Sequence, residues 1–377
     1  YTYSYVGMGE LAAWVVGWSL ILEYTVVCST VAVGWSGYAG GLMQQAGWAV
    51  PQALLAGPHA GGIINLPAIF ITLVVSALLL VGTRESATVN FILVIVKIVA
   101  LTAFVALTIP AFDAAHFEPF APFGFGATID ADGVKRGVAA AAGIIFFAFY
   151  GFDAISTAAE ETKNPGRDLT IGIIGSMFIC TAIYMIVAAA ALGASPFEVF
   201  SKSPEPLASI LRGLGHPQVA AVVAGAAVVA LPTVIMVFMF GQSRIFFAMA
   251  RDGLLPRGLS KVGARGVPAP VIVLTGVVAA SIAGFLPLDE IAALANAGTL
   301  LAFIATAIAM MLMRRRAPDL PRPFRTPLWW IVGPAAVAGC LYLFTTLPVS
   351  TLINFLIWNA IGVVAYLAYG RVKSRLA

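Results

Sequence analysis

The sequence predicts an all-α membrane protein, an integral bundle of about ten transmembrane helices. Hydrophobic residues make up 60% of the 377 residues and charged residues only 10%, and the mean hydropathy is +0.97. A soluble domain carries about 45–50% apolar and about 25% charged residues, so this chain has too few charges to cover a surface in water. Soluble globular, disordered, fibrous and disulfide-stapled classes are therefore excluded, and residues 1–377 are expected to form a single transmembrane domain.

Ten apolar stretches are long enough to cross a bilayer. A span needs about 20 apolar residues to cross about 30 Å of hydrocarbon. The expected spans are residues 10–42, 65–82, 87–110, 137–160, 169–193, 217–248, 269–286, 290–313, 328–348 and 351–370. Interruptions are expected at Gly151 in the fourth span and at Pro232 in the sixth. Breaks at membrane depth are tolerated only where the backbone is buried in protein or lines a cavity.

The basic residues predict the orientation of the bundle. Apart from Lys97, the chain has twenty Lys and Arg residues, and sixteen of them fall in one set of alternate loops or in the C-terminal tail. The opposite loops hold four, which are Lys135, Arg136, Lys202 and Arg212. Because basic residues accumulate on the cytoplasmic side, we expect a multi-pass protein of the cell membrane with both termini cytoplasmic. The net charge of +4 is then a topology signal, and no nucleic-acid partner is expected.

Residue types that carry enzyme or metal chemistry are sparse. The three histidines fall in predicted outer loops, and no nucleophile–base or metal-binding spacing is present. The three cysteines, Cys28, Cys180 and Cys340, lie inside apolar runs, which is typical of packing residues. We therefore expect neither an enzyme nor a metal site, and no cofactor beyond a proton as coupling ion.

Lys97 is the most informative single residue. It is the eleventh of 26 otherwise uncharged residues from Ala87 to Phe112, which places it about 15 Å from the start of that run. A charged Lys in the middle of a span costs at least about 2.5–3.5 kcal/mol on insertion scales. The functional interpretation is a cation that alternates with an ion or proton and donates to carbonyls of a broken helix. The alternative is a Lys that snorkels to one interface or is permanently neutralised by a carboxylate.

Four acidic residues are also candidates. Glu23 lies deep in the first span, where it could relay protons, pair with Lys97 or bond structurally to a neighbouring helix. Asp153 follows the predicted break and fits a helix cap. Glu160 and Glu161 lie near the cytoplasmic end of the same span. The default interpretation of these two glutamates is a solvated ion-pair cluster, and the alternative is an inner gate.

The fourth span predicts a binding site for an ammonium group. Its segment Phe147–Asp153 is aromatic up to Gly151 and polar after it, and a glycine lets a helix unwind. The end of the preceding half-helix then presents unpaired carbonyls, which accept hydrogen bonds from an ammonium, whereas the N-terminus of a half-helix favours a carboxylate. A zwitterionic amino acid needs both, and the sequence shows a clear candidate only for the first. Two or three of the aromatic residues are expected to line the pocket and the others to pack.

Several stretches resemble the amino acid–polyamine–organocation (APC) superfamily, and within it the bacterial permeases similar to cationic amino acid transporters. Lys97 in mid-helix is part of this resemblance. The matching stretches are GWSLILEY (17–24), HFEPFAPFGFGA (116–127), FFAFYGFDAISTAAEETKNPGRDL (146–169), GQSRIFFAMARDGLLP (241–256), LANAGTLLAF (294–303) and RRAPDLPRPFRTP (315–327). They follow one another along nearly the whole chain, and those at 146–169 and 241–256 are the most specific.

The resemblance implies a leucine-transporter-like fold of twelve helices, with two inverted five-helix repeats followed by two more helices. The ten spans are similar to the family's third to twelfth, so 1–112 would complete the first repeat, 113–314 would form the second, and 315–377 would hold the last two. The first helix of the family carries the break that binds the substrate carboxylate. The chain also starts without Met or a basic leader, and is therefore expected to begin inside a longer protein.

The resemblance also implies the roles of individual residues. The carbonyls of Phe147, Ala148 and Tyr150 are similar to those that hold the substrate ammonium at the Gly151 break, and Phe152 resembles the aromatic that covers the substrate.

Four other positions complete this implied site. Lys97 matches the lysine that replaces a sodium ion in proton-coupled members, while Glu23 and Tyr184 match polar positions of the same proton-linked network. Phe238 falls where pocket size is set, and its bulk favours small neutral substrates over arginine or lysine.

The expected function is proton-coupled uptake of small neutral L-amino acids by alternating access. The alternatives are an amino acid or polyamine exchanger, or uptake of cationic amino acids. A remote alternative is a proton-conducting subunit of an energy-transducing complex, although such subunits would string together more intramembrane charges than Lys97 and Glu23. The expected partners are the amino acid and the lipid bilayer, with a small accessory membrane protein as a further candidate.

Overall fold

The computed structural model describes residues 1–48, 50–82, 87–130, 134–152, 155, 162–261, 263, 267–322 and 324–374. The first part of the chain forms α1 (Thr2–Met8), α2 (Glu10–Gln45), η1 (Gln52–Leu54), β1 (Leu55–Ala56), η2 (Pro58–Ala60), β2 (Ile64–Asn65), α3 (Leu66–Val81), α4 (Ala87–Thr108), η3 (Ile109–Ala111), η4 (Ala114–Phe117), β3 (Thr128–Ile129), β4 (Lys135–Arg136), α5 (Val138–Ile145) and η5 (Phe146–Phe149). The remainder forms α6 (Pro165–Ala194), α7 (Phe197–Phe200), α8 (Pro206–Gly213), α9 (Pro217–Arg251), η7 (Arg257–Ser260), α10 (Ala269–Phe285), α11 (Leu288–Arg316), α12 (Trp329–Thr346), α13 (Val349–Ala365), η8 (Tyr366–Gly370) and α14 (Arg371–Lys373).

The predicted helical membrane bundle is confirmed. Within the described residues, seven helices are long and apolar enough to cross a bilayer, and they belong to α2, α4, α6, α9, α11, α12 and α13. Three shorter apolar helices, at 66–81, 138–149 and 269–285, complete the set. These ten helices correspond in order to the ten predicted spans. The only strands in the described residues form two short antiparallel pairs, β1 with β2 and β3 with β4.

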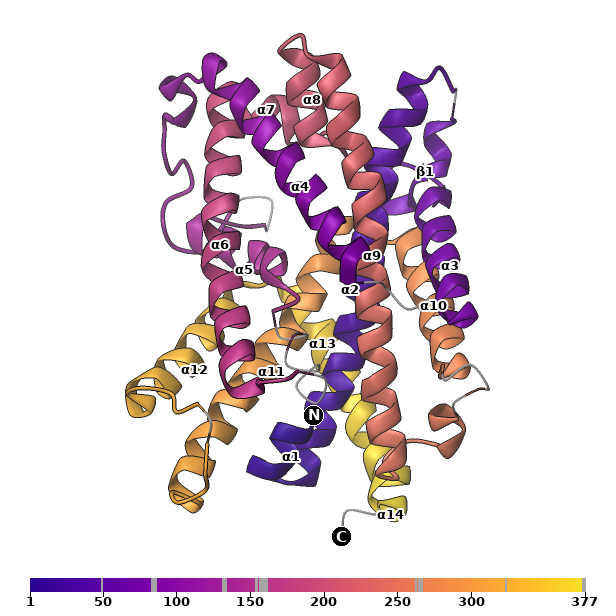
Figure 1. Cartoon of the computed structure of the whole chain (residues 1–377), viewed down its shortest axis with the longest axis vertical. Coiled ribbons are helices and arrows are strands. Elements are labelled where there is room, and N and C mark those ends of the chain that lie inside the picture. Colours follow the sequence, from indigo (N-terminus) through magenta and orange to yellow (C-terminus); the bar gives the residue numbers. More distant parts are fainter. Residues whose placement is uncertain are drawn as a thin grey trace.

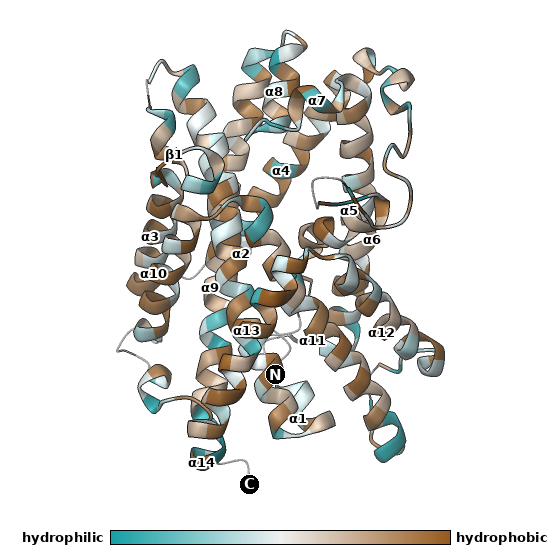
Figure 2. Ribbon diagram, turned by 180° about the vertical axis from the view of Figure 1, so that it is seen from behind, coloured by the Kyte–Doolittle hydropathy of each residue, from teal (hydrophilic) through white to brown (hydrophobic). Residues whose placement is uncertain are grey.

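Helix α2 lies at the centre of the bundle (Figure 1). It packs against α9 and α11 along much of its length and also contacts α3 and α10. Residues such as Val27, Ile235 and Ile272, from α2, α9 and α10, form the main apolar core there. By contrast, α4 and α6 turn large apolar side chains such as Phe91 and Phe178 outward, and the helices are brown over most of their length in Figure 2. An apolar outer surface of this extent is suited to lipid.

The two ends of the bundle differ in what they carry. Figure 1 places α7 and α8 at one end and α1 and α14 at the other, so that the described parts of both termini lie at the same end. Arg371 and Lys373 in α14 therefore lie at the opposite end from Arg212 in α8. This arrangement agrees with the alternation of spans that the loop charges predict.

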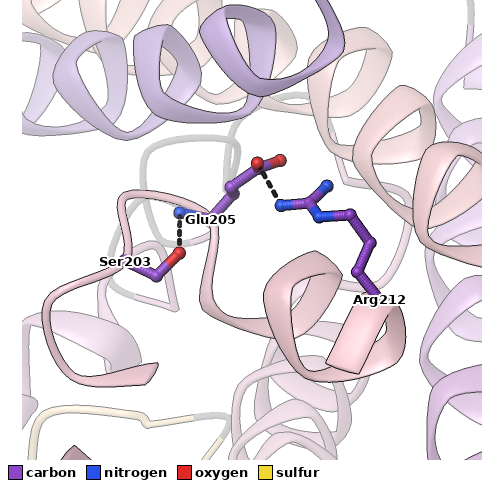
Figure 3. A network of polar contacts seen from close by, with 3 residues as sticks. All are labelled: Ser203, Glu205 and Arg212. Carbon is purple, nitrogen blue, oxygen red and sulfur yellow. Dashed lines mark hydrogen bonds and ion pairs between the residues drawn. The ribbon is translucent and has the colours of Figure 1, made fainter. Parts of the chain in front are cut away.

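A part-buried ion pair lies at the start of α8 (Figure 3), and its carboxylate packs against the end of α2. Glu205 is 6% exposed, it pairs with Arg212 of α8, and its backbone N–H donates to the hydroxyl of Ser203 over 3.2 Å. The Glu205 carboxylate lies so close to Gly41 of α2 that a side chain at Gly41 would overlap it. Gly41 thus provides the space that lets this carboxylate dock.

The predicted interruption at Pro232 is wrong, because α9 continues through it from Pro217 to Arg251. Proline has no backbone N–H, so the carbonyl four residues earlier loses its partner in the helix. That carbonyl belongs to Val228, and the indole Nε1 of Trp35 in α2 donates to it over 2.8 Å. A side chain from a neighbouring helix therefore supplies the hydrogen bond that proline cannot.

This replacement can be tested with a double-mutant cycle. Trp35→Phe should lower the free energy of unfolding by about 1–3 kcal/mol, because it leaves the part-buried Val228 carbonyl without its donor. Pro232→Ala restores a backbone N–H at the right position, so Trp35→Phe should cost less in that background. Thermal unfolding of the wild type, both single variants and the double variant in detergent measures the difference. Equal losses in the two backgrounds would contradict this interpretation of the bond.

Candidate functional site

The predicted break in the fourth span is present. Helix α5 ends at Ile145, the chain continues as the 3-10 turn η5 over Phe146–Phe149, and Gly151 has φ 109°. A side chain would be strained at this φ, which explains why glycine occupies the position. Asp153, Glu160 and Glu161, for which a cap or an inner gate was considered, lie outside the described residues.

Asn296 of α11 is hydrogen-bonded both to the last turn of α5 and to Tyr150, which follows η5. Its Nδ2 donates to the carbonyls of Gly143 and Ile144, over 2.8 and 3.0 Å, in the last turn of α5. Its Oδ1 accepts a hydrogen bond of 2.6 Å from the hydroxyl of Tyr150. The side chain is fully buried, at 0% exposure. Sequence reasoning missed Asn296, although an asparagine within the apolar stretch LANAG is a detectable signal.

Tyr184 of α6 reaches the break from the other side. Its hydroxyl donates to the carbonyl of Ala148 over 2.7 Å, and its ring meets Phe149 edge to face at 5.4 Å between centroids. The structure thus brings a residue predicted for proton coupling directly to a carbonyl predicted to hold the substrate ammonium.

A cavity of ≈ 190 Å³ lies between the break and α6. On the side of the break it is lined by Ala148, Phe149, Tyr150, Gly151, Phe152 and Ile155, and on α6 by Ser176, Met177, Cys180 and Tyr184. Four predicted substrate-binding residues therefore share one cavity with Tyr184. No charged side chain is found among the described residues that line it.

Aromatic rings pack around the break. Phe152 lies 5.2 Å from Phe303 of α11 between ring centroids, and Phe147 lies 5.1 Å from Tyr150. Phe146 is edge to face with both Tyr150 and Phe303. Of these aromatic residues, Phe149, Tyr150 and Phe152 line the cavity.

Phe238 is not among the residues that line the cavity. It is 4% exposed and meets Tyr24 of α2 edge to face at 5.2 Å. It belongs to the main apolar core, against which Phe147 and Tyr150 also pack. An influence of Phe238 on pocket size would therefore be indirect, through the packing of this core.

The two deep charged residues lie on different helix interfaces. Glu23 is 1% exposed, and it lies on α2 against Gly298 of α11, where an added methyl group would come within 3.1 Å of the Glu23 Cβ. Lys97 is half-buried in the middle of α4, which packs against α6 and α9. The helix that carries Lys97 thus contacts α6, which also lines the cavity. The pairing of Lys97 with Glu23 stays a hypothesis.

Comparisons with known proteins agree with this architecture. A family model described as amino acid permease matches residues 1–366. The chain is 41% identical over 381 residues to the branched-chain amino acid permease BcaP of Bacillus subtilis (strain 168). This match covers 100% of this chain and 80% of that protein. The chain is 37% identical over 379 residues to the methylthioribose transporter of the same organism, again with 100% and 80% coverage.

More distant relatives extend beyond bacteria. The chain is 32% identical over 338 residues to the vacuolar cationic amino acid transporter 4 of Arabidopsis thaliana, covering 85% of this chain and 53% of that protein. Together with the match over residues 1–366, these similarities show that the chain belongs to the amino acid permease family of the APC superfamily, a family of membrane transporters and not of enzymes.

Proposed function

We propose that this protein takes up neutral amino acids with small or branched aliphatic side chains, together with protons, by alternating access. The observation that carries the proposal is the cavity at the Gly151 break, where backbone carbonyls and aromatic rings line the same space. Alternating access then requires that substrate and proton each bind one state of the carrier more tightly than the other.

The break offers acceptors for the substrate ammonium. The carbonyl of Ala148 accepts one hydrogen bond from Tyr184, and because a carbonyl oxygen has two lone pairs, it can accept another from an ammonium. The carbonyls of Phe147 and Tyr150 are the other proposed acceptors. An ammonium bound there would lie beside the hydroxyl of Tyr184, which supports a link between substrate binding and the proton-coupling residues.

The surroundings favour an uncharged, apolar substrate side chain. The described lining supplies Phe149, Phe152 and Met177 but no carboxylate that would neutralise an arginine or lysine side chain. Two relatives at 41% and 30% identity are named as branched-chain amino acid permeases, which also supports an apolar substrate side chain. The relatives named for methylthioribose and for cationic amino acids define the competing substrates.

Lys97 is proposed as the proton-coupling residue, with Glu23 and Tyr184 as its network. A half-buried lysine in the middle of a span is costly unless its charge is used or compensated. We further propose a cell-membrane location with the end that carries α1 and α14 in the cytoplasm, since most Lys and Arg residues belong to that side. A small accessory membrane protein stays a candidate partner.

Substrate choice is tested by uptake of a labelled panel into proteoliposomes containing the natural full-length protein. We expect leucine, isoleucine, valine and alanine to be accumulated, and methylthioribose, arginine and lysine to be excluded. Phe238→Leu should extend the accepted set toward larger side chains, because it loosens the core against which Phe147 and Tyr150 pack. The matched control is Phe246→Leu, since Phe246 is a buried residue of the same helix in another apolar cluster. Uptake limited to methylthioribose or to cationic amino acids would refute the proposed substrate class.

Proton coupling is tested by replacing Lys97 with Gln. Without an ionisable group at this position, a pH gradient should no longer drive accumulation, which should fall to the level of protein-free vesicles. Exchange of internal for external substrate should persist, since the cavity itself is intact. Lys163→Gln is the control, because Lys163 is an exposed lysine outside the helices. Gradient-driven accumulation that survives in Lys97→Gln would show that another group couples the proton.

A further inference from the structure

The strongest unassigned feature of the structure is the polar side chain of Asn296. It lies nine residues into α11, surrounded by alanines, and is fully buried. Its three hydrogen bonds all go to the break, two to the carbonyls of Gly143 and Ile144 and one from Tyr150. A side chain needed only for helix packing would not require this set of bonds.

The need for side-chain donors follows from where α5 ends, and it is clearest at Gly143, because the N–H of Phe146 also reaches the carbonyl of Ile144. The last four carbonyls of a helix have no partner within it, and at membrane depth no bulk water replaces the missing bonds. Gly143 and Ile144 belong to this last turn, since α5 ends at Ile145. The two N–H groups of one asparagine amide satisfy both.

The same amide fixes the other end of the break. The bond from the Tyr150 hydroxyl to Oδ1 holds Tyr150, whose ring packs on Phe146 and Phe147 and whose residue lines the cavity. Asn296 therefore spans the turn from Gly143 to Tyr150, with the carbonyls of Phe147 and Ala148 between its contacts. Asparagine suits this task because it can donate twice and accept at the same time, whereas an ionised aspartate can only accept.

We propose that Asn296 is a positioning residue of the transport site, which holds the broken segment in the conformation that presents its carbonyls to the substrate. It acts through Tyr150 and the backbone and does not itself line the cavity. The claim that Asn296 affects substrate binding rests on the proposed function. The claim that Asn296 fixes the conformation of the break does not.

The test uses Cys180 as a reporter, because its thiol lines the cavity beside the break. The background carries Cys340→Ser, which leaves Cys180 and the fully buried Cys28. Three variants, Asn296→Asp, Asn296→Leu and Tyr150→Phe, remove different parts of the network. Asn359→Asp is the matched control, since Asn359 is a membrane-depth asparagine of α13 that bonds Ser19 and Phe355 away from the break.

The first readout needs no substrate. The rate at which a charged methanethiosulfonate reagent modifies Cys180 in the empty protein should rise in both Asn296 variants and stay unchanged in Asn359→Asp. Thermal unfolding identifies any variant that fails to fold. If Asn296→Leu does not fold, Tyr150→Phe still provides the test, because it removes only a single hydroxyl. An unchanged modification rate in Asn296→Asp and Tyr150→Phe would overturn the inference.

The second readout separates positioning from a general loss of folding. In Asn296→Asp the KM for leucine should rise by about two- to tenfold, the equivalent of one net hydrogen bond, and leucine should protect Cys180 less well. The effects of Asn296→Leu and Tyr150→Phe on KM should not add in full, because the bond that Tyr150→Phe removes is already absent in Asn296→Leu. Additive effects, or a lower kcat with KM unchanged, would contradict positioning. A wild type that leucine does not protect would refute the proposed substrate while leaving the first readout valid.

Discussion

Everything at this site depends on one constraint, which is that backbone polar groups at membrane depth must be hydrogen-bonded within the protein. The chain breaks its own helix at Ile145 and takes up a left-handed backbone at Gly151. That change releases carbonyls from the helix in a place where water cannot satisfy them. The structure provides side-chain donors from α11 and α6 for three of them, at Gly143, Ile144 and Ala148.

The same requirement for hydrogen-bonded backbone groups also applies to α9, which packs against α2. Helix α2 packs between α9 and α11, and it carries both Trp35, which satisfies the carbonyl released by Pro232, and Glu23, which lies against Gly298. Asn296 and Gly298 are close neighbours on α11. Helix α11 therefore contacts both the break and Glu23.

Hydropathy alone was sufficient to predict the ten helices, because each is a run of apolar residues long enough to be recognised without its neighbours. The break could also be predicted, since Gly151 follows a run of aromatic residues and takes a φ that other residues avoid. What could not be predicted were the contacts between distant positions. Asn296 and Tyr150 lie 146 residues apart in sequence, and Trp35 and Val228 lie 193 apart. For that reason neither the hydrogen bonds of Asn296 nor the continuity of α9 through Pro232 could be read from the sequence.

The most direct test of this account is a structure of the natural full-length protein with bound leucine. The account predicts that the α-ammonium of leucine lies within hydrogen-bonding distance of the carbonyls of Phe147, Ala148 or Tyr150, with its side chain against Phe149 or Phe152. A leucine bound elsewhere in the bundle, or a continuous helix through residues 146–152 in the loaded protein, would contradict it.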